Sequence, residues 1–272
     1  MQIQGKTALV LGAVKGIGKE IGTALAKEGA ELVLTRHDWE DSFGEMEKDF
    51  SESRAEHIII TADLRNVQDI KNLAMKIEKR YGQLDILINN IERGGWPTVH
   101  GEYIEDQWDL EIETTLKAKQ WVFTSVLPLL RKSREAVVIN ISSIAGIVGR
   151  SGPAALVFND GYAAASRGVS SLTETWARLG APDIRVNEIM LGIFETRHAQ
   201  HTRGWDEVLT KEEQHSLINH TLLLRTGTID DVVKACLFII KDAPYMTGSV
   251  LRLDGGYVLA GEKVPPMPKG VV

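Results

Sequence analysis

Short apolar segments alternate along the chain with longer segments in which apolar residues recur at helical spacing. The apolar segments predict strands at 7–11, 31–35, 57–61, 84–89, 136–141, 184–189 and 249–253. The amphipathic segments predict helices at 18–27, 67–81, 103–131 and 162–179, with an interruption of the third near Pro128. Strand–helix units of this length, repeated in series, are typical of a parallel sheet covered by helices. The pattern therefore predicts an α/β fold: a single doubly wound domain whose seven-stranded, mainly parallel sheet has helices on both faces.

Two segments depart from this alternation. Residues 195–224 are polar and rich in histidine and contain no clear strand, which predicts a substrate lid. Residues 261–272 include Pro265, Pro266 and Pro268 and predict a C-terminal tail outside the core. No linker-like composition and no internal repeat divide the rest, so we expect one domain over residues 1–260, with the lid as part of it.

Composition narrows the class of protein. The chain has 272 residues, a net charge of −6 and 43% hydrophobic residues, which is typical of a globular protein and not of a basic nucleic-acid-binding one. No apolar segment approaches the ~20 residues that span a bilayer. These features predict a cytoplasmic protein with a small-molecule substrate and neither membrane nor nucleic acid as a partner. The only cysteine, Cys236, excludes an intrachain disulfide, and its apolar surroundings predict a buried structural thiol.

A glycine-rich loop joins the first predicted strand to the first predicted helix. It reads Gly12-Ala13-Val14-Lys15-Gly16-Ile17-Gly18. Glycines let the backbone approach a pyrophosphate, and the helix N-terminus supplies N–H donors and the positive end of its dipole. The spacing matches neither Gly-x-Gly-x-x-Gly nor a P-loop. Its place between strand and helix favours nucleotide binding over an ordinary strand-to-helix turn.

Further motifs follow the glycine loop in order. They are Ala62-Asp63-Leu64, Asn89-Asn90, Asn140-Ile141-Ser142-Ser143, Tyr162 at the start of an alanine-rich helix, Ile184-Arg185-Val186-Asn187 and Asp254-Gly255-Gly256. Taken together, this series resembles the short-chain dehydrogenase/reductase family from about residue 5 to residue 257. The resemblance implies a doubly wound Rossmann sheet with a nicotinamide cofactor at the carboxyl ends of the strands.

The resemblance also implies which residues contact the cofactor. Asp63 and Leu64 correspond to residues that meet the adenine, and Asn89 and Asn90 to residues that line the cofactor backbone. Thr196 corresponds to a residue that meets the carboxamide. The full set of predicted cofactor-binding residues is Gly12, Lys15, Gly16, Ile17, Gly18, Arg36, Asp63, Leu64, Asn89, Asn90, Gly192 and Thr196.

The end of the second strand predicts which nicotinamide cofactor is bound. Relatives that prefer NAD carry an acidic residue there, and this chain has Arg36. A guanidinium pairs well with a 2′-phosphate, and Lys15 adds a second cation on the same side, with a weak contribution from His37. We therefore expect NADP(H) to be preferred over NAD(H). The alternative is that Arg36 and Lys15 are solvated surface charges.

The catalytic motif matches the family only in part. Tyr162 occupies the position of the family's acid–base tyrosine, and Ser143 that of its substrate-orienting serine. The alternative for Tyr162 is an ordinary core residue, and the alternative for Ser143 is a strand-end hydroxyl that caps a turn. The family's lysine, four residues after the tyrosine, is replaced by Ser166, and its asparagine by Thr115. Arg167 is a poor substitute, because five residues advance a helix by about 500° and point it away from Tyr162.

The motif after the fourth strand and the motif after the sixth strand differ as well. The usual Asn-Asn-Ala-Gly reads Asn89-Asn90-Ile91-Glu92, which brings a carboxylate toward the nicotinamide end, and the usual Pro-Gly reads Leu191-Gly192. Without a nearby cation a tyrosine, with a pKa of about 10, donates a proton more readily than it accepts one. We therefore expect an NADP(H)-dependent oxidoreductase that transfers a hydride between nicotinamide and a carbonyl or alcohol substrate, favouring reduction.

Two alternatives remain from the sequence. One is a cofactor-binding protein of the same fold without redox catalysis, serving as a sensor or partner subunit. The other is a lyase or isomerase in which Glu92 is a new acid–base group. The resemblance also implies a homodimer or homotetramer built on the helices near 108–126 and 162–179.

Other polar and aromatic side chains have simpler interpretations. His198 and His201 are three residues apart, but no third ligand has metal-site spacing, so no metal is predicted and both are interpreted as solvated. Trp96, Trp205 and Tyr257 either line the substrate pocket or pack in the core or an interface.

Overall fold

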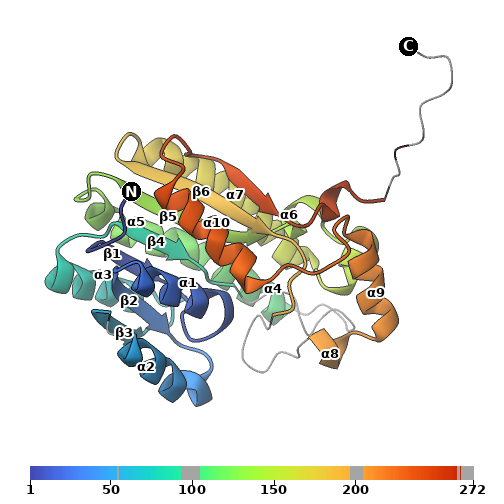
Figure 1. Ribbon diagram of the computed structural model, residues 1–272, viewed down its shortest axis with the longest axis horizontal. Helices are drawn as coiled ribbons and strands as arrows, with labels where there is room; N and C mark the ends of the chain where they lie inside the picture. Colours follow the sequence, from blue (N-terminus) through green and yellow to red (C-terminus); the bar gives the residue numbers. More distant parts are fainter. Residues whose placement is uncertain (54, 93–104, 197–204, 262–263, 265–272) are drawn as a thin grey trace, which may run out of the picture.

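The structure is a computed structural model that describes residues 1–53, 55–92, 105–196, 205–261 and 264, without the side chains of residues 106, 107, 207 and 208. Its centre is a seven-stranded sheet (Figure 1). The strands are β1 (Thr7–Val10), β2 (Glu31–Arg36), β3 (His57–Thr61), β4 (Ile86–Asn89), β5 (Ala136–Ser143), β6 (Ile184–Leu191) and β7 (Val250–Leu253). They lie in the order β3-β2-β1-β4-β5-β6-β7, and every neighbouring pair is parallel. This arrangement confirms the predicted doubly wound α/β fold.

Helices cover both faces of the sheet. The described helices are α1 (Gly16–Lys27), α2 (Phe43–Glu52), α3 (Val67–Tyr81), α4 (Glu105–Glu111), α5 (Ala118–Leu130), α6 (Ala145–Val148), α7 (Asp160–Gly180), α8 (Trp205–Val208), α9 (Lys211–His220) and α10 (Ile229–Lys241). Buried side chains of α1, α2 and α10 pack on one face, and those of α3, α5 and α7 on the other. Because both faces are covered, β1 and β4 are buried at every position, as continuous apolar strands require.

The predicted interruption near Pro128 is wrong. Helix α5 runs through Pro128 and ends at Leu130. Only two residues follow the proline, and Leu129 and Leu130 are both buried in the core, so the missing N–H costs little of the helix. The irregular segment lies earlier, where Ile112–Lys117 forms a π-helix, η2, between α4 and α5. Such segments often occur at functional sites.

The structure describes only part of the predicted lid and of the predicted C-terminal tail. The predicted lid contains α8 and α9, and α9 begins with a capping box formed by Thr210 and Glu213. Residues 197–204, with His198 and His201, lie outside the described residues, as does Trp96. Most of the predicted tail lies outside them too. The lid and the domain bounds therefore stay predictions.

Cys236 is 1% exposed in α10, and its burial raises the pKa of the thiol, which agrees with the predicted structural role.

Within the described parts of the chain, we find no helix with the length and apolar character that crossing a membrane requires.

Candidate active site

The glycine loop brings β1 close to the loop that follows β4. Gly12 has φ +64, and a Cβ added there would lie 2.6 Å from the carbonyl oxygen of Asn90. Only glycine fits this position without strain. The Gly12 N–H donates to Thr35 Oγ1 (3.0 Å), which ties the loop to β2. Helix α1 begins four residues later, and Lys15, its N-cap residue, makes no side-chain cap hydrogen bond. The loop therefore presents the N-terminus of α1 at the carboxyl edge of the sheet.

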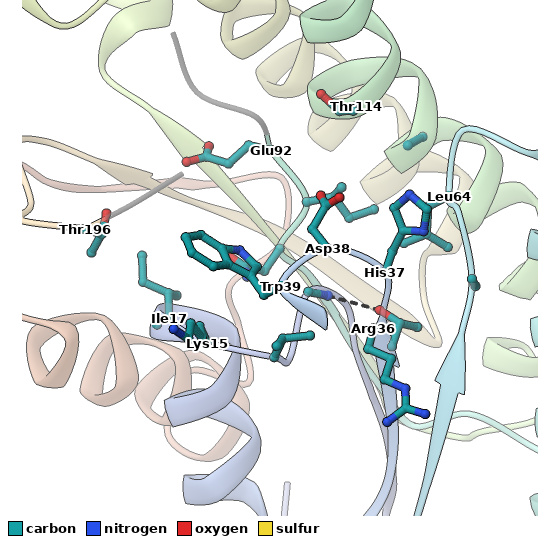
Figure 2. A pocket seen from close by; sticks show the side chains of 18 of the residues that line it. Lys15, Ile17, Arg36, His37, Asp38, Trp39, Leu64, Glu92, Thr114 and Thr196 are labelled. Atoms are coloured by element: carbon teal, nitrogen blue, oxygen red, sulfur yellow. Dashed lines mark hydrogen bonds between the residues drawn. The ribbon is translucent and has the colours of Figure 1, made fainter. Parts of the chain in front are cut away.

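A cavity of about 460 Å³ opens at this edge (Figure 2). Its walls come from the ends of β1, β2, β3 and β4, where parallel α/β sheets bind ligands. Of the predicted cofactor-binding residues, it is lined by Gly12, Lys15, Gly16, Ile17, Arg36, Asp63, Leu64, Asn90 and Thr196. Three do not line it: Gly18 packs against the Gly12 backbone, Asn89 is fully buried against Asn140, and Gly192 lies at a second cavity.

The cations of this cavity have partners within the protein. The Arg36 guanidinium pairs with Glu47 (2.5 Å), donates to Thr61 Oγ1 (3.0 Å) and stacks on the Phe43 ring at 4.4 Å. In Figure 2 it points away from the indole of Trp39. Lys15 Nζ lies 4.9 Å from the centroid of that indole, within cation–π range. Both cations therefore line the cavity while they are held by neighbouring side chains.

Where β3 ends at the first cavity, Asp63 is paired with Arg65. The guanidinium donates to both carboxylate oxygens, at 2.9 and 2.7 Å, and His37 Nε2 lies 3.7 Å away. The hydrogen bonds from Arg65 lower the pKa of Asp63, so this carboxylate stays ionised.

A second, smaller cavity of about 40 Å³ contains the predicted catalytic pair. Ser143 and Tyr162 line it together with Gly192. The rest of the described wall is mostly apolar and includes Val157, Phe158, Leu191, Ile193, Phe194 and Trp205. Ile17, Glu92 and Thr196 line both cavities. The second cavity therefore begins where the first one ends, and Glu92 stands at the junction.

Tyr162 is held at this junction from two sides. Its hydroxyl donates to Glu92 Oε2 at 2.8 Å, and its backbone N–H donates to Asn159 Oδ1, the N-cap of α7, at 2.9 Å. Burial, followed by the negative charge of Glu92, holds the pKa of Tyr162 well above its usual range, and a hydrogen bond with Ser143 opposes that shift. Tyr162 is therefore protonated throughout the neutral range and suited to donate a proton.

The two substituted positions are buried away from both cavities. Ser166 on α7 and Thr115 on η2 are fully buried, and neither lines a cavity. Counting only residues that the structure describes, neither hydroxyl oxygen has a hydrogen-bond partner. Arg167 is exposed, as the helical geometry predicts. No side chain of α7 therefore brings a cation to the site from the family's lysine position.

Two buried charges near the site were not predicted from the sequence. Lys119 on α5 is fully buried and its ammonium donates to the carbonyl oxygen of Ile91. Glu188 on β6 is also fully buried; it accepts hydrogen bonds from the hydroxyls of Ser142 and Ser170, the latter at 3.1 Å. Burial lowers the pKa of Lys119 to about 8, against the charges of Glu92 and Glu188, and burial raises the pKa of Glu188.

Each of these two charged residues interrupts a run of buried apolar positions. That interruption is the signal in the sequence from which they could have been found. Lys119 lies on the same face of α5 as Val122, Phe123 and Val126, all buried. Glu188 interrupts the buried strand Ile184–Leu191. A charged side chain at such a position lowers the stability of the fold unless it is paired, because burying a charge costs free energy.

Residues 12–258 match a family model described as Enoyl-(Acyl carrier protein) reductase. The chain belongs to the short-chain dehydrogenase/reductase family. Curated relatives include 3-oxoacyl-[acyl-carrier-protein] reductase FabG of Thermotoga maritima, 32% identical over 95% of this chain and 100% of the relative. Another is 1,6-dihydroxycyclohexa-2,4-diene-1-carboxylate dehydrogenase of Pseudomonas putida, 29% identical over 94% of this chain and 93% of the relative.

Solved structures agree with this family assignment. A putative short-chain alcohol dehydrogenase from Sinorhizobium meliloti 1021 superposes with a TM-score of 0.79 at 26% identity, covering 94% of this chain and 98% of that one. The protein gox2181 superposes with a TM-score of 0.83 over 94% of this chain and 96% of its own. At 22% identity it supports the fold alone. The predicted class, an NAD(P)-dependent oxidoreductase of the short-chain dehydrogenase/reductase type, is supported by the curated relatives.

Proposed function

We propose that this protein is an NADP(H)-dependent reductase that transfers a hydride from the nicotinamide to a carbonyl carbon and protonates the product oxygen from Tyr162. One observation carries the proposal: the dinucleotide-sized cavity and the pocket of Ser143 and Tyr162 share the walls formed by Glu92 and Thr196. A nicotinamide in the first cavity would end beside the tyrosine in the second.

The residues of the first cavity fit a nicotinamide dinucleotide. The close approach of Gly12 to Asn90 leaves no room for a side chain at position 12, and the N-terminus of α1 offers backbone donors to a pyrophosphate. Lys15 stands at the same end of the helix. When bound, the cofactor supplies the hydride. Gly12, Lys15, Gly16, Ile17, Arg36, Asp63, Leu64, Asn90 and Thr196 would hold it, with Gly18 packed behind Gly12, Asn89 buried beside Asn90, and Gly192 at the second cavity.

A preference for NADP(H) rests on Arg36. The last residue of β2 is Arg36 and not an acid, and the Asp38 carboxylate lines the same cavity two residues later. A 2′-phosphate at the end of β2 would compete with Glu47 for the Arg36 guanidinium. A phosphate carries more charge than a carboxylate and accepts bidentate hydrogen bonds from arginine. The guanidinium therefore has a partner in the free protein and would exchange it on binding.

The state of Tyr162 supports reduction as the favoured direction. A protonated tyrosine beside Ser143 donates a proton to a carbonyl oxygen as that oxygen gains negative charge. Alcohol oxidation must start from a tyrosinate, which the burial of Tyr162 and the charge of Glu92 both disfavour in the resting protein. Reduction starts from the protonated tyrosine and leaves a tyrosinate, which takes up a proton from water before the next turnover. Ser143 Oγ accepts the Ala145 N–H at 3.1 Å and lines the same cavity as Tyr162, where its hydroxyl would share the substrate oxygen.

The second cavity limits the chemistry of the substrate. The described side chains around the tyrosine are apolar apart from Ser142, Ser143, Glu92 and Thr196. A carbonyl flanked by apolar groups fits this wall, and an anionic group next to the carbonyl would meet the Glu92 carboxylate. We therefore infer a neutral ketone or aldehyde with an apolar side.

The oligomeric state is also a proposal. Helices α5 and α7 leave Trp121 and Leu179 exposed, at 38% and 53%. Each is a large apolar side chain on the surface of a helix that the family resemblance places in the interface. They support the predicted homodimer or homotetramer, and a cytoplasmic location stays a prediction beside it.

The test is NADPH oxidation against a panel of neutral ketones and aldehydes, with NADH and Tyr162→Phe as controls. We expect turnover with NADPH, slower turnover with NADH, and a 10²- to 10⁴-fold loss in Tyr162→Phe. NADPH binding without turnover of any carbonyl would instead support the cofactor-binding protein without redox catalysis. Tighter binding of NADH than of NADPH would overturn the cofactor preference.

A further inference from the structure

The position of Lys119 is unusual for a lysine. Its side chain is wholly enclosed, and its ammonium donates a hydrogen bond to the backbone carbonyl of Ile91, in the loop after β4. A methionine or leucine of similar length would fill this part of the core without burying a charge. Since burial of an ammonium is costly and replacement by apolar groups is often neutral or stabilising, packing alone does not account for the lysine.

The geometry of α5 directs this lysine toward the active site. Side chains on a helix lean toward its N-terminus, and the N-terminus of α5 continues into η2, which carries Thr115. Lys119 is one helical turn beyond Thr115. Its partner Ile91 directly precedes Glu92, the residue that accepts the Tyr162 hydroxyl. Three links therefore connect the ammonium to the tyrosine: its hydrogen bond to Ile91, the peptide bond from Ile91 to Glu92, and the hydrogen bond between Glu92 and Tyr162.

The opposing helix lacks a cation at the corresponding place. Helix α7 packs against η2 so closely that a Cβ on Gly168 would lie 2.9 Å from Leu116. On α7, Ser166 occupies the family's lysine position, fully buried and, among the described residues, without a hydrogen-bond partner. Glu188, on strand β6, is the buried carboxylate that the sheet contributes to this region. Both Glu188 and Glu92 interact electrostatically with Lys119. A lysine is thus missing on α7 and present on the facing α5.

We propose that Lys119 replaces, from α5, the active-site cation that position 166 on α7 lacks. It is a positioning residue: by holding the carbonyl of Ile91, the residue before Glu92, it fixes Glu92 against the Tyr162 hydroxyl. Its part in the reaction rests on the function proposed above. Its part in the geometry does not.

The test moves the cation between the two helices. Lys119→Met removes it, and Lys119→Met/Ser166→Lys returns one at the family position. Lys119→Gln keeps a donor for the Ile91 carbonyl without the charge and serves if the methionine variant does not fold. Lys117→Met is the matched control, because Lys117 is two residues away, exposed, and paired only with Glu113 among the ion pairs of the described residues.

Three quantities are measured on each variant: the Tyr162 Oη–Glu92 Oε2 distance in a crystal structure, the dissociation constant of NADPH, and kcat for the best carbonyl of the panel. We expect Lys119→Met to lengthen the distance beyond 3.5 Å and to lower kcat at least tenfold, with the NADPH dissociation constant changed less than threefold. The double variant restores kcat to within threefold of the parent. Lys117→Met leaves all three unchanged.

The outcomes separate this inference from the proposed function. An unchanged distance and unchanged kcat in Lys119→Met, in an enzyme that reduces carbonyls, would overturn the inference and leave the function standing. No turnover by the parent protein, together with a distance that lengthens in Lys119→Met, would overturn the function and support the positioning role. A loss of kcat that the double variant does not recover would reject the replacement of one lysine by the other.

Discussion

The Tyr162 hydroxyl donates a 2.8 Å hydrogen bond to Glu92 Oε2. The tyrosine at the catalytic position of this family thus faces a carboxylate, where the resemblance would place a lysine nearby. A cation stabilises a tyrosinate, whereas a carboxylate stabilises the protonated hydroxyl that it accepts from. The protein has therefore kept the tyrosine and has a different charge beside it.

Replacing Glu92 should alter the direction in which the enzyme works best. Glu92→Gln keeps a hydrogen-bond acceptor and removes the negative charge that helps to raise the pKa of Tyr162. We expect the pH at which alcohol oxidation reaches half its maximum to fall by at least one unit, because a tyrosinate then forms more readily. Carbonyl reduction at pH 7 should change less than about threefold. The measurement is kcat/KM against pH in both directions, and identical oxidation profiles for the two proteins would contradict it.

The pairing of Arg36 with Glu47 leads to a prediction about cofactor affinity. Arg36→Leu should weaken NADPH binding about 10- to 100-fold, the value of one or two charge-assisted hydrogen bonds, and leave NADH within about threefold. Glu47→Gln should tighten NADPH binding, since it removes the carboxylate that competes for the guanidinium. Isothermal titration calorimetry measures both. The control is Lys48→Leu, which removes an exposed lysine of α2, the helix that carries Glu47. Equal weakening of NADPH and NADH by Arg36→Leu would show that Arg36 does not read the 2′-phosphate.

The buried ammonium of Lys119 should make stability depend on pH in an alkaline window. Its pKa is lowered to about 8 in the folded protein from 10.5. Between these values the unfolded chain binds more protons, so the free energy of unfolding rises with pH, by about 1.4 kcal/mol per pH unit. Other groups titrate in the same range, and comparison with Lys119→Met removes their contribution. Urea unfolding of both proteins from pH 7 to pH 10 should show the parent gaining stability relative to the variant above pH 8. Parallel curves would mean that Lys119 keeps its usual pKa.

The fold could be predicted because its periodicity is strong. The strand His57–Thr61 and the helix Val67–Tyr81 have the predicted bounds, since each contrasts sharply with its flanking residues. Pro128 misled the prediction because its effect depends on how much helix follows it, which the sequence does not display. The π-helix Ile112–Lys117 has no local signal, because its extra residue is accommodated by packing against α7.

The sequence predicts which side chains gather near Tyr162, but not how they contact one another. Motif order was enough to place Tyr162, Ser143 and Glu92 near one another, and the structure puts all three at one cavity. The bond between Tyr162 and Glu92 depends on the path of the loop after β4, which no local pattern defines. Lys119 was overlooked because a lysine in an amphipathic helix is usually exposed, and only the buried neighbours Val122 and Phe123 show that this one faces inward.

Asn159 offers a test of how the N-terminus of α7 is held. Its Oδ1 accepts the Tyr162 N–H, and its Nδ2 donates to Glu111 Oε1 at 2.5 Å; both residues are buried. Asn159→Ala should lose the cap at a cost of about 1 kcal/mol, with more for the buried amide contact. Asn159→Asp keeps the cap acceptor and places a second carboxylate against Glu111, so one of the two pKa values rises in the folded state. Below that raised pKa the repulsion is relieved by protonation, and stability therefore returns as the pH falls. Thermal unfolding at pH 7 and pH 5 should show Asn159→Asp recovering relative to Asn159→Ala, whereas equal shifts in the two variants would show that Glu111 and residue 159 do not interact.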